Sequence, residues 1–330
     1  MTPPLVEVEA ISRTYRMRSG LFGRTSSVRA VDGLSFSIQK GETLGIVGES
    51  GSGKSTTGRM VLGLEPPDRG SVRFHGAPIA APGSAAWRAQ RARMQMIFQD
   101  PLGALDRRLP VAAQIREPLD IHDIGTAAER DARVHELLQA VDLNDGHGAR
   151  YPGALSGGQR QRIVLARALA TKPDFLVCDE PVSALDVSIQ AQVVNLLVDL
   201  QARLGLTMLF ISHDLRVVRQ ISSKVAVMYL GRIVEYGDAD DLFARPQHPY
   251  TQALVSASPA PGRRSTSRIV LTGDPPNPAA RPAGCAFHPR CSHATARCAN
   301  ELPALAALDR QRQVACHLVS GLQSQTEVAA

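Results

Sequence analysis

The sequence predicts an α/β fold built on a largely parallel sheet, and two observations lead to this fold class. Short apolar runs of strand length alternate with segments of helical periodicity, and the clearest runs are residues 43–47, 175–178 and 207–211. Residues 48–55, directly after the first run, match the phosphate-binding loop pattern G-x-x-x-x-G-K-[ST]. A helix between successive strands makes those strands parallel, so we expect a parallel core.

Length and composition set further bounds. At 330 residues, 44% of them hydrophobic and 21% charged, the chain can bury one large core and a small appendage. No apolar run approaches the roughly 20 residues that span a bilayer, and the N-terminus lacks the basic and apolar regions of a signal peptide. We therefore expect a cytoplasmic protein; if it works at a membrane, other chains must hold it there. The arginines behind the net charge of +6 are spread along the chain, so we expect no nucleic acid partner.

The first predicted elements in chain order are strands. Residues 5–11 alternate between apolar and polar side chains, as a half-buried strand does. Gly20 and Gly23 interrupt the polar stretch that follows, which predicts a loop or a hairpin. Residues 35–38 are the second predicted strand. Residues 43–47 are the third, and because this run is apolar on both faces we expect it in the centre of the sheet.

Helices and strands alternate over the rest of the chain. A helix is predicted from about residue 55 to residue 64, before Pro66 and Pro67. The later elements are a strand at 94–98, helical structure through 110–150 with its clearest periodicity at 127–141, a helix at 159–171 closed by Pro173, and the strands at 175–178 and 207–211. Residues 257–284, rich in Pro, Ala, Arg and Ser, are typical of a linker or a wrap-around segment.

The phosphate loop predicts a nucleotide site with Mg²⁺. Its glycines let backbone N–H groups point at phosphate oxygens, and the following helix presents its positive end to the same anion. We expect Lys54 to reach the β- and γ-phosphates and the Ser55 hydroxyl to ligate Mg²⁺. The residues expected to contact the nucleotide here are Gly48, Glu49, Ser50, Gly51, Ser52, Gly53, Lys54, Ser55 and Thr56.

Two carboxylates follow the apolar strand at 175–178. Asp179 stands at the end of a buried parallel strand, at the rim of the sheet where nucleotides bind, and is expected to help hold Mg²⁺. Glu180 is next in the chain and is expected to polarise an attacking water as a general base.

A second glycine-containing motif, Leu-Ser-Gly-Gly-Gln at 155–159, narrows the class of protein. It opens a helix whose N-terminus can bind an anion, although the phosphate loop already provides one anion site. Together and in this order, the two motifs resemble those of the ATP-binding subunit of ABC transporters. The resemblance implies that two subunits sandwich two ATP molecules and that the γ-phosphate bound by a partner is capped by Ser156, Gly157, Gly158 and Gln159.

The same resemblance implies roles for residues outside the two motifs. His213 matches the switch histidine that contacts the γ-phosphate, and Gln99 matches the glutamine that approaches Mg²⁺ and the attacking water. Asp186 ends a Ser-Ala-Leu-Asp stretch that matches the loop communicating between two ATPase subunits. Tyr15 matches the aromatic residue that stacks on adenine.

The family fold is a P-loop NTPase with a RecA-like core, an antiparallel β subdomain and an α-helical subdomain. On this basis we predict a nucleotide-binding domain at 1–256, with its helical subdomain at about 100–158. A cysteine-bearing C-terminal extension at 257–320 and a disordered tail at 321–330 complete the predicted organisation.

Four of the five cysteines lie in this extension, at Cys285, Cys291, Cys298 and Cys316. Their spacing leaves an iron–sulfur cluster, a zinc site and unliganded thiols all open. Zinc could also take ligands from His288, His293 and His317. Residues 247–254 and the four cysteines resemble ATPases of the dipeptide/oligopeptide importer subfamily, where the four cysteines hold a [4Fe-4S] cluster.

The resemblance implies an ATP-hydrolysing subunit of a di- or oligopeptide importer, at the cytoplasmic face of the membrane. Residues 16–29 and those after Gln99 are more similar to the subunit called F-type. The implied partners are a second ATPase subunit, in a heterodimer or a homodimer, two membrane-spanning permease subunits and an external solute-binding protein. An importer of nickel, glutathione or another solute, and a soluble ABC ATPase acting on ribosomes or DNA, are the alternatives.

Overall fold

The computed structural model describes residues 3–18, 25–101, 103–183, 185–258, 269–274, 276–309 and 311–319. In these ranges the strands form two sheets. One is antiparallel, in the order β2-β1-β4-β5, and the other has the order β11-β12-β10-β9-β3-β8-β7-β6. The strands are β1 (Val6–Arg18), β2 (Thr25–Ile38), β3 (Thr43–Val47), β4 (Arg69–Phe74), β5 (Ala77–Pro78), β6 (Met94–Ile97), β7 (Phe175–Asp179), β8 (Thr207–Ser212), β9 (Lys224–Tyr229), β10 (Arg232–Asp238), β11 (Ala306–Ala307) and β12 (Gln313–Val314).

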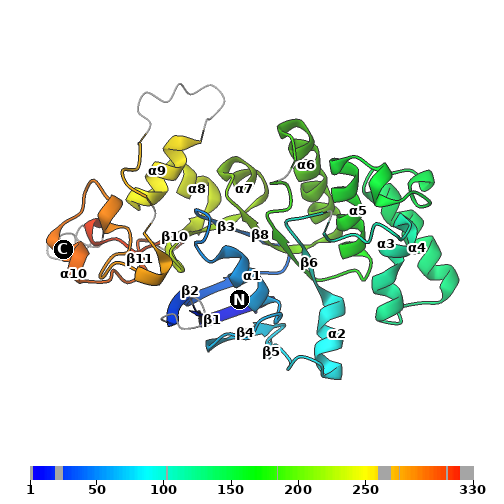
Figure 1. Ribbon diagram of the computed structural model, residues 1–330, viewed down its shortest axis with the longest axis horizontal. Helices are drawn as coiled ribbons and strands as arrows, with labels where there is room; N and C mark the ends of the chain where they lie inside the picture. Colours follow the sequence, from blue (N-terminus) through cyan, green and yellow to red (C-terminus); the bar gives the residue numbers. More distant parts are fainter. Residues whose placement is uncertain are drawn as a thin grey trace.

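The core of the larger sheet is parallel, as the sequence predicts: β6 pairs with β7, β7 with β8, β8 with β3 and β3 with β9. Figure 1 shows the antiparallel sheet beneath one face of this sheet, with α1 next to it, and further helices on the opposite face. The helices are α1 (Lys54–Val61), α2 (Ala85–Arg93), α3 (Val111–Ile121), α4 (Ala127–Ala140), α5 (Gly157–Leu169), α6 (Val187–Leu204), α7 (Leu215–Ile221), α8 (Ala239–Ala244), α9 (Pro249–Ala257) and α10 (Ala296–Asn300).

Each central strand contributes to two apolar clusters, one on each face of the sheet. In β8, Met208 and Phe210 pack with the helical side, whereas Leu209 and Ile211 pack with the antiparallel sheet. Strand side chains point alternately to opposite faces, so a run that is apolar at every position must be covered on both sides. Cys178 of β7 is fully buried in the first of these clusters, as a small core residue.

Several predicted boundaries differ from the observed ones. The strand predicted at 5–11 continues to Arg18, because register shifts between Val8 and Thr14 break the alternation without ending the pairing with β2. The loop or hairpin predicted at Gly20 and Gly23 lies outside the described residues. The helical stretch predicted at 110–150 is divided into α3, α4 and a short 3₁₀ turn, with a new start at the Thr126–Glu129 capping box.

The C-terminal extension is joined to the main sheet by strand pairing. β12 pairs with β10, at Glu235 opposite Val314, and β11 pairs with β12. The described part of the segment predicted as a linker also contacts the body, because Arg281 forms an ion pair with Asp32 at 2.6 Å. The proposed tail at 321–330 lies outside the described residues. Within the described ranges, no helix has both the length and the apolar character that a membrane crossing requires.

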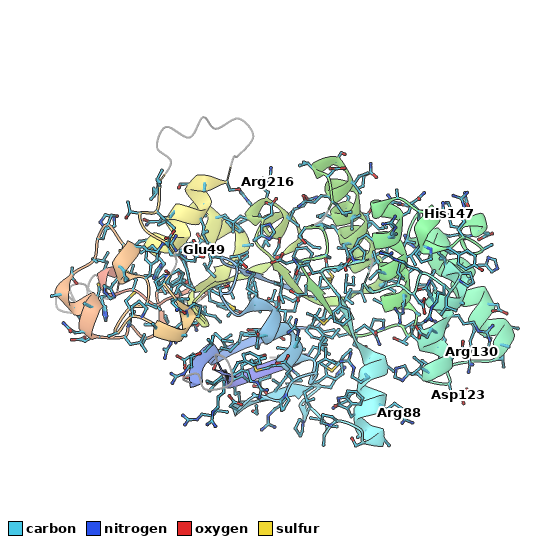
Figure 2. The ribbon with its side chains drawn as sticks, in the orientation of Figure 1. Glu49, Arg88, Asp123, Arg130, His147 and Arg216 are labelled. Carbon is cyan, nitrogen blue, oxygen red and sulfur yellow. The ribbon has the colours of Figure 1, made fainter. Side chains whose placement is uncertain are left out.

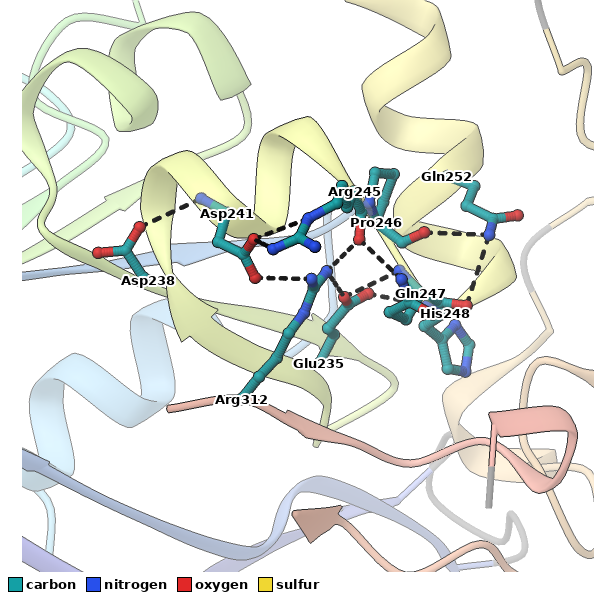
Figure 3. A network of polar contacts seen from close by, with 9 residues as sticks. All are labelled: Glu235, Asp238, Asp241, Arg245, Pro246, Gln247, His248, Gln252 and Arg312. Atoms are coloured by element: carbon teal, nitrogen blue, oxygen red, sulfur yellow. Dashed lines mark hydrogen bonds and ion pairs between the residues drawn. The ribbon is translucent and has the colours of Figure 1, made fainter. Parts of the chain in front are cut away.

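A buried ion pair fixes the extension to β10 (Figure 3). Glu235 is fully buried and accepts the backbone N–H groups of Gln247 and His248, both at 2.9 Å, as well as a bond from Arg312 at 2.6 Å. Arg312 also bonds Asp241 at 2.9 Å. The carboxylate of Glu235 is thus satisfied by the extension on one side and by the start of α9 on the other.

We predict that Arg312→Ala destabilises the chain strongly, because it leaves the Glu235 carboxylate buried without its charged partner. The expected loss in the free energy of unfolding is about 3–5 kcal/mol, measured by urea denaturation. Arg219→Ala is the matched control, since its ion pair with Asp240 is exposed, and should change stability by less than about 1 kcal/mol. Equal losses in the two variants would contradict this account of the buried pair.

Candidate functional site

The carboxyl ends of parallel strands meet at one edge of the larger sheet, where loops with polar residues follow them. β3 leads into residues 48–53, β7 ends at Asp179, and β8 is followed by His213. Gln99 comes shortly after β6, which pairs with β7. Because these strands are neighbours in register, their loops lie side by side.

The phosphate loop requires glycine where its backbone passes close to other segments. Gly53, at φ 100°, would place a Cβ atom only 2.1 Å from the carbonyl oxygen of Ala30. Gly48 would place one 2.2 Å from the carbonyl oxygen of Met228. No side chain fits at either position. Gly53 is also the N-cap of α1, so the loop ends at a helix N-terminus whose free N–H groups favour an anion.

Lys54 is buried beneath this loop. Its ammonium group donates to the carbonyl oxygens of Gly48 at 2.8 Å and Glu49 at 3.0 Å, which uses two of its three donor hydrogens. Burial lowers the pKa of Lys54, while the nearby carboxylates of Glu180, Asp179 and Glu49 oppose that shift. The lysine therefore carries a poorly hydrated positive charge that a phosphate group would stabilise.

Ser55 and Asp179 form the part of the site that suits a divalent cation. The Ser55 hydroxyl donates to Oδ1 of Asp179 at 2.8 Å. Burial raises the pKa of Asp179, and the negative charge of Glu180 adds to this effect. A hard cation such as Mg²⁺ prefers oxygen ligands and would relieve the repulsion between the two carboxylates.

Glu180 lies between two of the predicted catalytic side chains. Its Oε2 accepts from the Gln99 amide at 3.3 Å and lies 3.2 Å from Nδ1 of His213. Since a carboxylate only accepts, that contact assigns the hydrogen to Nδ1 and leaves Nε2 of a neutral ring as an acceptor. Glu180 has a left-handed backbone with φ 48°, which costs about 1–2 kcal/mol for a residue with a side chain.

These groups surround one cleft of about 600 Å³. Its lining includes Lys54, Ser55, Gln99, Glu180 and His213 together with glycines of the phosphate loop. A positive loop, a cation site and a carboxylate that can polarise water therefore share one cavity. This arrangement suits the hydrolysis of a phosphate anhydride.

The second glycine motif does not belong to this cleft. Ser156 caps α5 through a capping box with Gln159, and neither residue is among those that surround the cleft. Gly157 and Gly158 lie instead close to the side chains of Leu185 and Ile189, next to the start of α6. The chain thus carries two separate helix N-termini that can bind anions.

Two other residues of the predicted site, Tyr15 and Asp186, do not line the cleft. Tyr15 is half-buried, and its hydroxyl donates to Glu65. Burial raises the pKa of Tyr15, and its hydrogen bond to Glu65 adds to this effect, whereas a hydrogen bond with Thr56, at the start of α1, opposes it. The Arg13 guanidinium lies 5.3 Å from the centre of its ring.

Asp186 is the exposed N-cap residue of α6, and Ala184 just before it lies outside the described residues.

The four C-terminal cysteines surround one pocket. His288 and His317 also line this pocket, whereas His293 does not. Burial raises the pKa of Cys285, Cys291 and Cys316, with a further contribution from neighbouring cysteines. Across the described ranges, however, no three His, Cys, Asp or Glu side chains form a group that could hold a metal ion. The predicted [4Fe-4S] cluster and its zinc alternative therefore gain no support from this geometry.

One connection to the phosphate loop was not predicted from the sequence. Arg290 of the extension forms two hydrogen bonds with the carboxylate of Glu49, at 2.8 and 3.0 Å, and the Tyr250 hydroxyl accepts the backbone N–H of Glu49 at 2.9 Å. Tyr250 lies in the stretch 247–254, and Arg290 directly precedes Cys291, so both belong to the regions that resemble the importer subfamily. No local pattern links either residue to Glu49, which is 201 residues from Tyr250 and 241 residues from Arg290.

Comparison with known proteins identifies two families in the chain. The ABC transporter family matches residues 31–183, and the family described as oligopeptide/dipeptide transporter, C-terminal region, matches residues 234–298. The chain is 52% identical to a putative peptide import ATP-binding protein of Brucella ovis, over 92% of this chain and 94% of that protein. It is 48% identical to the oligopeptide transport ATP-binding protein AppF of Bacillus subtilis, over 96% of this chain and 98% of that one.

Solved structures agree with these matches. The dimeric, post-hydrolysis ATP-binding cassette MJ0796 with bound ADP and Pi is 27% identical, with a TM-score of 0.63 over 71% of this chain and 98% of that one. CbiO1 of Clostridium perfringens, part of the ABC transporter complex cbiONQ, is 26% identical, with a TM-score of 0.64 over 73% and 91% of the two chains. The predicted fold class is confirmed.

We predict that Gly53→Ala weakens the binding of a fluorescent ATP analogue at least about tenfold. The added methyl group combines an unfavourable positive φ with a clash against the Ala30 carbonyl group, so the loop must move. Gly41→Ala is the matched control, because its φ is 76° but a Cβ atom there meets nothing within 4 Å. That variant should lose stability and keep its affinity for the analogue. Unchanged affinity in Gly53→Ala would contradict the role given to this close approach.

Proposed function

Since this chain belongs to the ATP-binding subunits of ABC transporters, in the oligopeptide/dipeptide branch, we propose that it binds and hydrolyses ATP to drive the import of peptides. The observation that carries the proposal is the cleft that joins the phosphate loop to Glu180, Gln99 and His213. The near full-length similarity to peptide import proteins supports the class of substrate. Import of another solute, such as nickel or glutathione, is the alternative, and other chains of the transporter would select the substrate.

In this proposal each part of the cleft has one task. The loop N–H groups and Lys54 bind the phosphates, and Ser55 with Asp179 holds Mg²⁺, aided by Gln99. Glu180 accepts a proton from the attacking water, while His213 orients the reacting phosphate. Tyr15 stacks on the adenine ring, a task supported by its position next to Thr56 at the start of α1.

The glycine motif that lies outside the cleft is our reason for expecting a second ATPase subunit. Ser156, Gly157 and Gly158 open α5 away from the phosphate loop of their own chain. We infer that they cap the nucleotide bound by another ATPase subunit, and that Asp186 contacts that subunit. The similarity of this chain to the subunit called F-type favours a heterodimer. A single copy should then hydrolyse ATP slowly.

A groove beside Gln99 suits the membrane-spanning partner. It is lined by residues that follow β6 and by α3 and α5, and it includes Phe98 and Ile121, which are 49% and 62% exposed. Large apolar side chains that remain exposed in such a groove favour an apolar partner segment. We propose that a cytoplasmic segment of the permease docks here, which would place the chain at the cytoplasmic face of the membrane. A solute-binding protein on the other side would deliver the peptide.

The test is an affinity pull-down of Glu180→Gln with ATP from detergent-solubilised membranes. This variant should bind ATP and hydrolyse it at least about 100-fold more slowly, which traps the closed pair of subunits. Two multi-spanning proteins and a second ATPase should be recovered. Adding Ile121→Glu should lose the membrane proteins and keep the second ATPase. Recovery of ribosomal or DNA-repair proteins, or normal turnover by Glu180→Gln, would overturn the proposal.

The four cysteines are proposed to hold a [4Fe-4S] cluster, within an extension at 257–320 that follows the ATPase domain at 1–256. One observation supports this: the spacing of the four cysteines matches that of the importer subfamily. A cluster is larger than a single ion, so its ligands stand further apart than those of zinc. When bound, it would cross-link a region that has little apolar core of its own.

Cys316→Ser should therefore lose bound iron and visible absorbance when the protein is purified without oxygen. Cys178→Ala is the matched control, because Cys178 is buried in the ATPase core away from the pocket, and it should keep its iron. A full iron content in Cys316→Ser, or zinc in place of iron in the unaltered chain, would contradict the cluster.

A further inference from the structure

Glu49 of the phosphate loop is held at three points, and two of them come from the C-terminal part of the chain. Its carbonyl oxygen accepts from Lys54 at 3.0 Å. Its backbone N–H donates to the Tyr250 hydroxyl at 2.9 Å, and its carboxylate is bound by Arg290. The family pattern of the phosphate loop leaves this position unspecified, so nothing in that pattern accounts for these contacts.

The contact with Arg290 has the geometry of a strong ion pair. Two guanidinium nitrogens bond the two carboxylate oxygens, at 2.8 and 3.0 Å. The Arg290 side chain is only 7% exposed and that of Glu49 is 27% exposed. A bidentate, largely buried pair fixes direction as well as distance, so the orientation of Glu49 depends on the position of Arg290.

Arg290 is itself held by the turn that carries two cysteines. Its backbone N–H donates to Phe287 at 3.0 Å, and Cys291 is the next residue, with its own N–H bonded to His288. The N–H of Cys285 bonds the carbonyl oxygen of Cys298 at 2.8 Å. A movement of the turn that carries Cys291 would therefore shift Arg290 as well.

A second route runs through aromatic side chains. Phe287 and His248 line the cysteine pocket, and the Phe287 ring lies 5.4 Å from that of Tyr250 and 5.3 Å from that of Tyr229. Tyr250 is fully buried, so its hydroxyl cannot move without displacing these rings. The packing around the cysteine pocket thus sets the position of the Tyr250 hydroxyl, which accepts the hydrogen bond from the Glu49 N–H.

We propose that the cysteine-bearing extension positions the phosphate loop, through Arg290 and Tyr250 acting together on Glu49. Arg290 is a positioning residue in this scheme: it contacts the loop and not the nucleotide. The affinity for nucleotide then depends on the folded state of the cysteine region. Because coupling between two sites is reciprocal, bound nucleotide must also stabilise that region.

The test is a double-mutant cycle on the full-length chain, read by binding of a fluorescent ATP analogue with Mg²⁺. Arg290→Gln and Glu49→Gln should each weaken binding about five- to tenfold. The double variant should bind the analogue no more weakly than the single variant with the lower affinity, because the same interaction is lost in all three. Arg290→Lys keeps the positive charge but cannot form the two parallel hydrogen bonds of a guanidinium group. Its affinity for the analogue should lie between those of the unaltered chain and Arg290→Gln.

Arg297→Gln is the matched control, since its ion pair with Glu301 lies in the same extension but is exposed. It should bind the analogue like the unaltered chain. Additive losses in the cycle, or an equal loss in Arg297→Gln, would overturn the proposal. Should Arg290→Gln fail to fold, Tyr250→Phe, which removes the hydroxyl that accepts the Glu49 N–H, is compared with Arg297→Gln: weaker binding in Tyr250→Phe alone supports the proposal, and equal binding in the two variants overturns it.

Hydrogen exchange provides the reciprocal measurement. Nucleotide should slow amide exchange across residues 285–298 in the unaltered chain, and should slow it less in Glu49→Gln at saturating nucleotide, where only the bond from the Glu49 N–H to Tyr250 remains. Equal protection in both would show that the coupling takes another path. The inference rests on the proposed nucleotide site, and the failures are distinguishable: an unaltered chain that binds no nucleotide would defeat the proposed function itself.

Discussion

The whole nucleotide site depends on how closely the phosphate loop approaches its neighbours. The carbonyl groups of Ala30 and Met228 leave no room for a side chain at Gly53 or Gly48. Ala30 belongs to the antiparallel sheet and Met228 to β9, so these contacts fix the loop against both sheets at once. Only with the loop in this place do Lys54 and Ser55 lie beside Asp179 and Glu180.

Local chemistry made much of this site predictable. A central strand must be apolar on both faces, a phosphate loop needs glycine, and the rim of a parallel sheet collects the residues that follow its strands. For these reasons the loop pattern predicts the roles of Lys54 and Ser55, and the position of Asp179 and Glu180 relative to the other motifs predicts theirs. Gln99 and His213 needed the family resemblance, because a single polar residue after a strand is compatible with many roles. Their contacts with Glu180 support the roles that the resemblance implied.

Long-range geometry was the part that sequence could not supply. The alternation of β1 ended at residue 11 although the strand continues, because bulges shift the register without stopping the pairing. The extension was predicted as an appended region, yet β12 pairs with the main sheet and Arg290 reaches the phosphate loop. These contacts join residues separated by most of the chain, and no periodic pattern records them. Figure 2 shows Glu49 among the side chains where the ATPase core meets the extension.

The pairing of β12 with β10 also bears on how the chain avoids self-association. Without it, β10 would present a row of unpaired N–H and carbonyl groups along seven residues, and such an edge is a template for sheet growth between molecules. The extension pairs with the middle of that row, at Glu235 and Tyr236, and there the edge of the sheet becomes β11, which has two residues. An edge so short offers few bonds to a second chain. Shortening the protein at this end would therefore endanger its solubility before it affected any chemistry in the cleft.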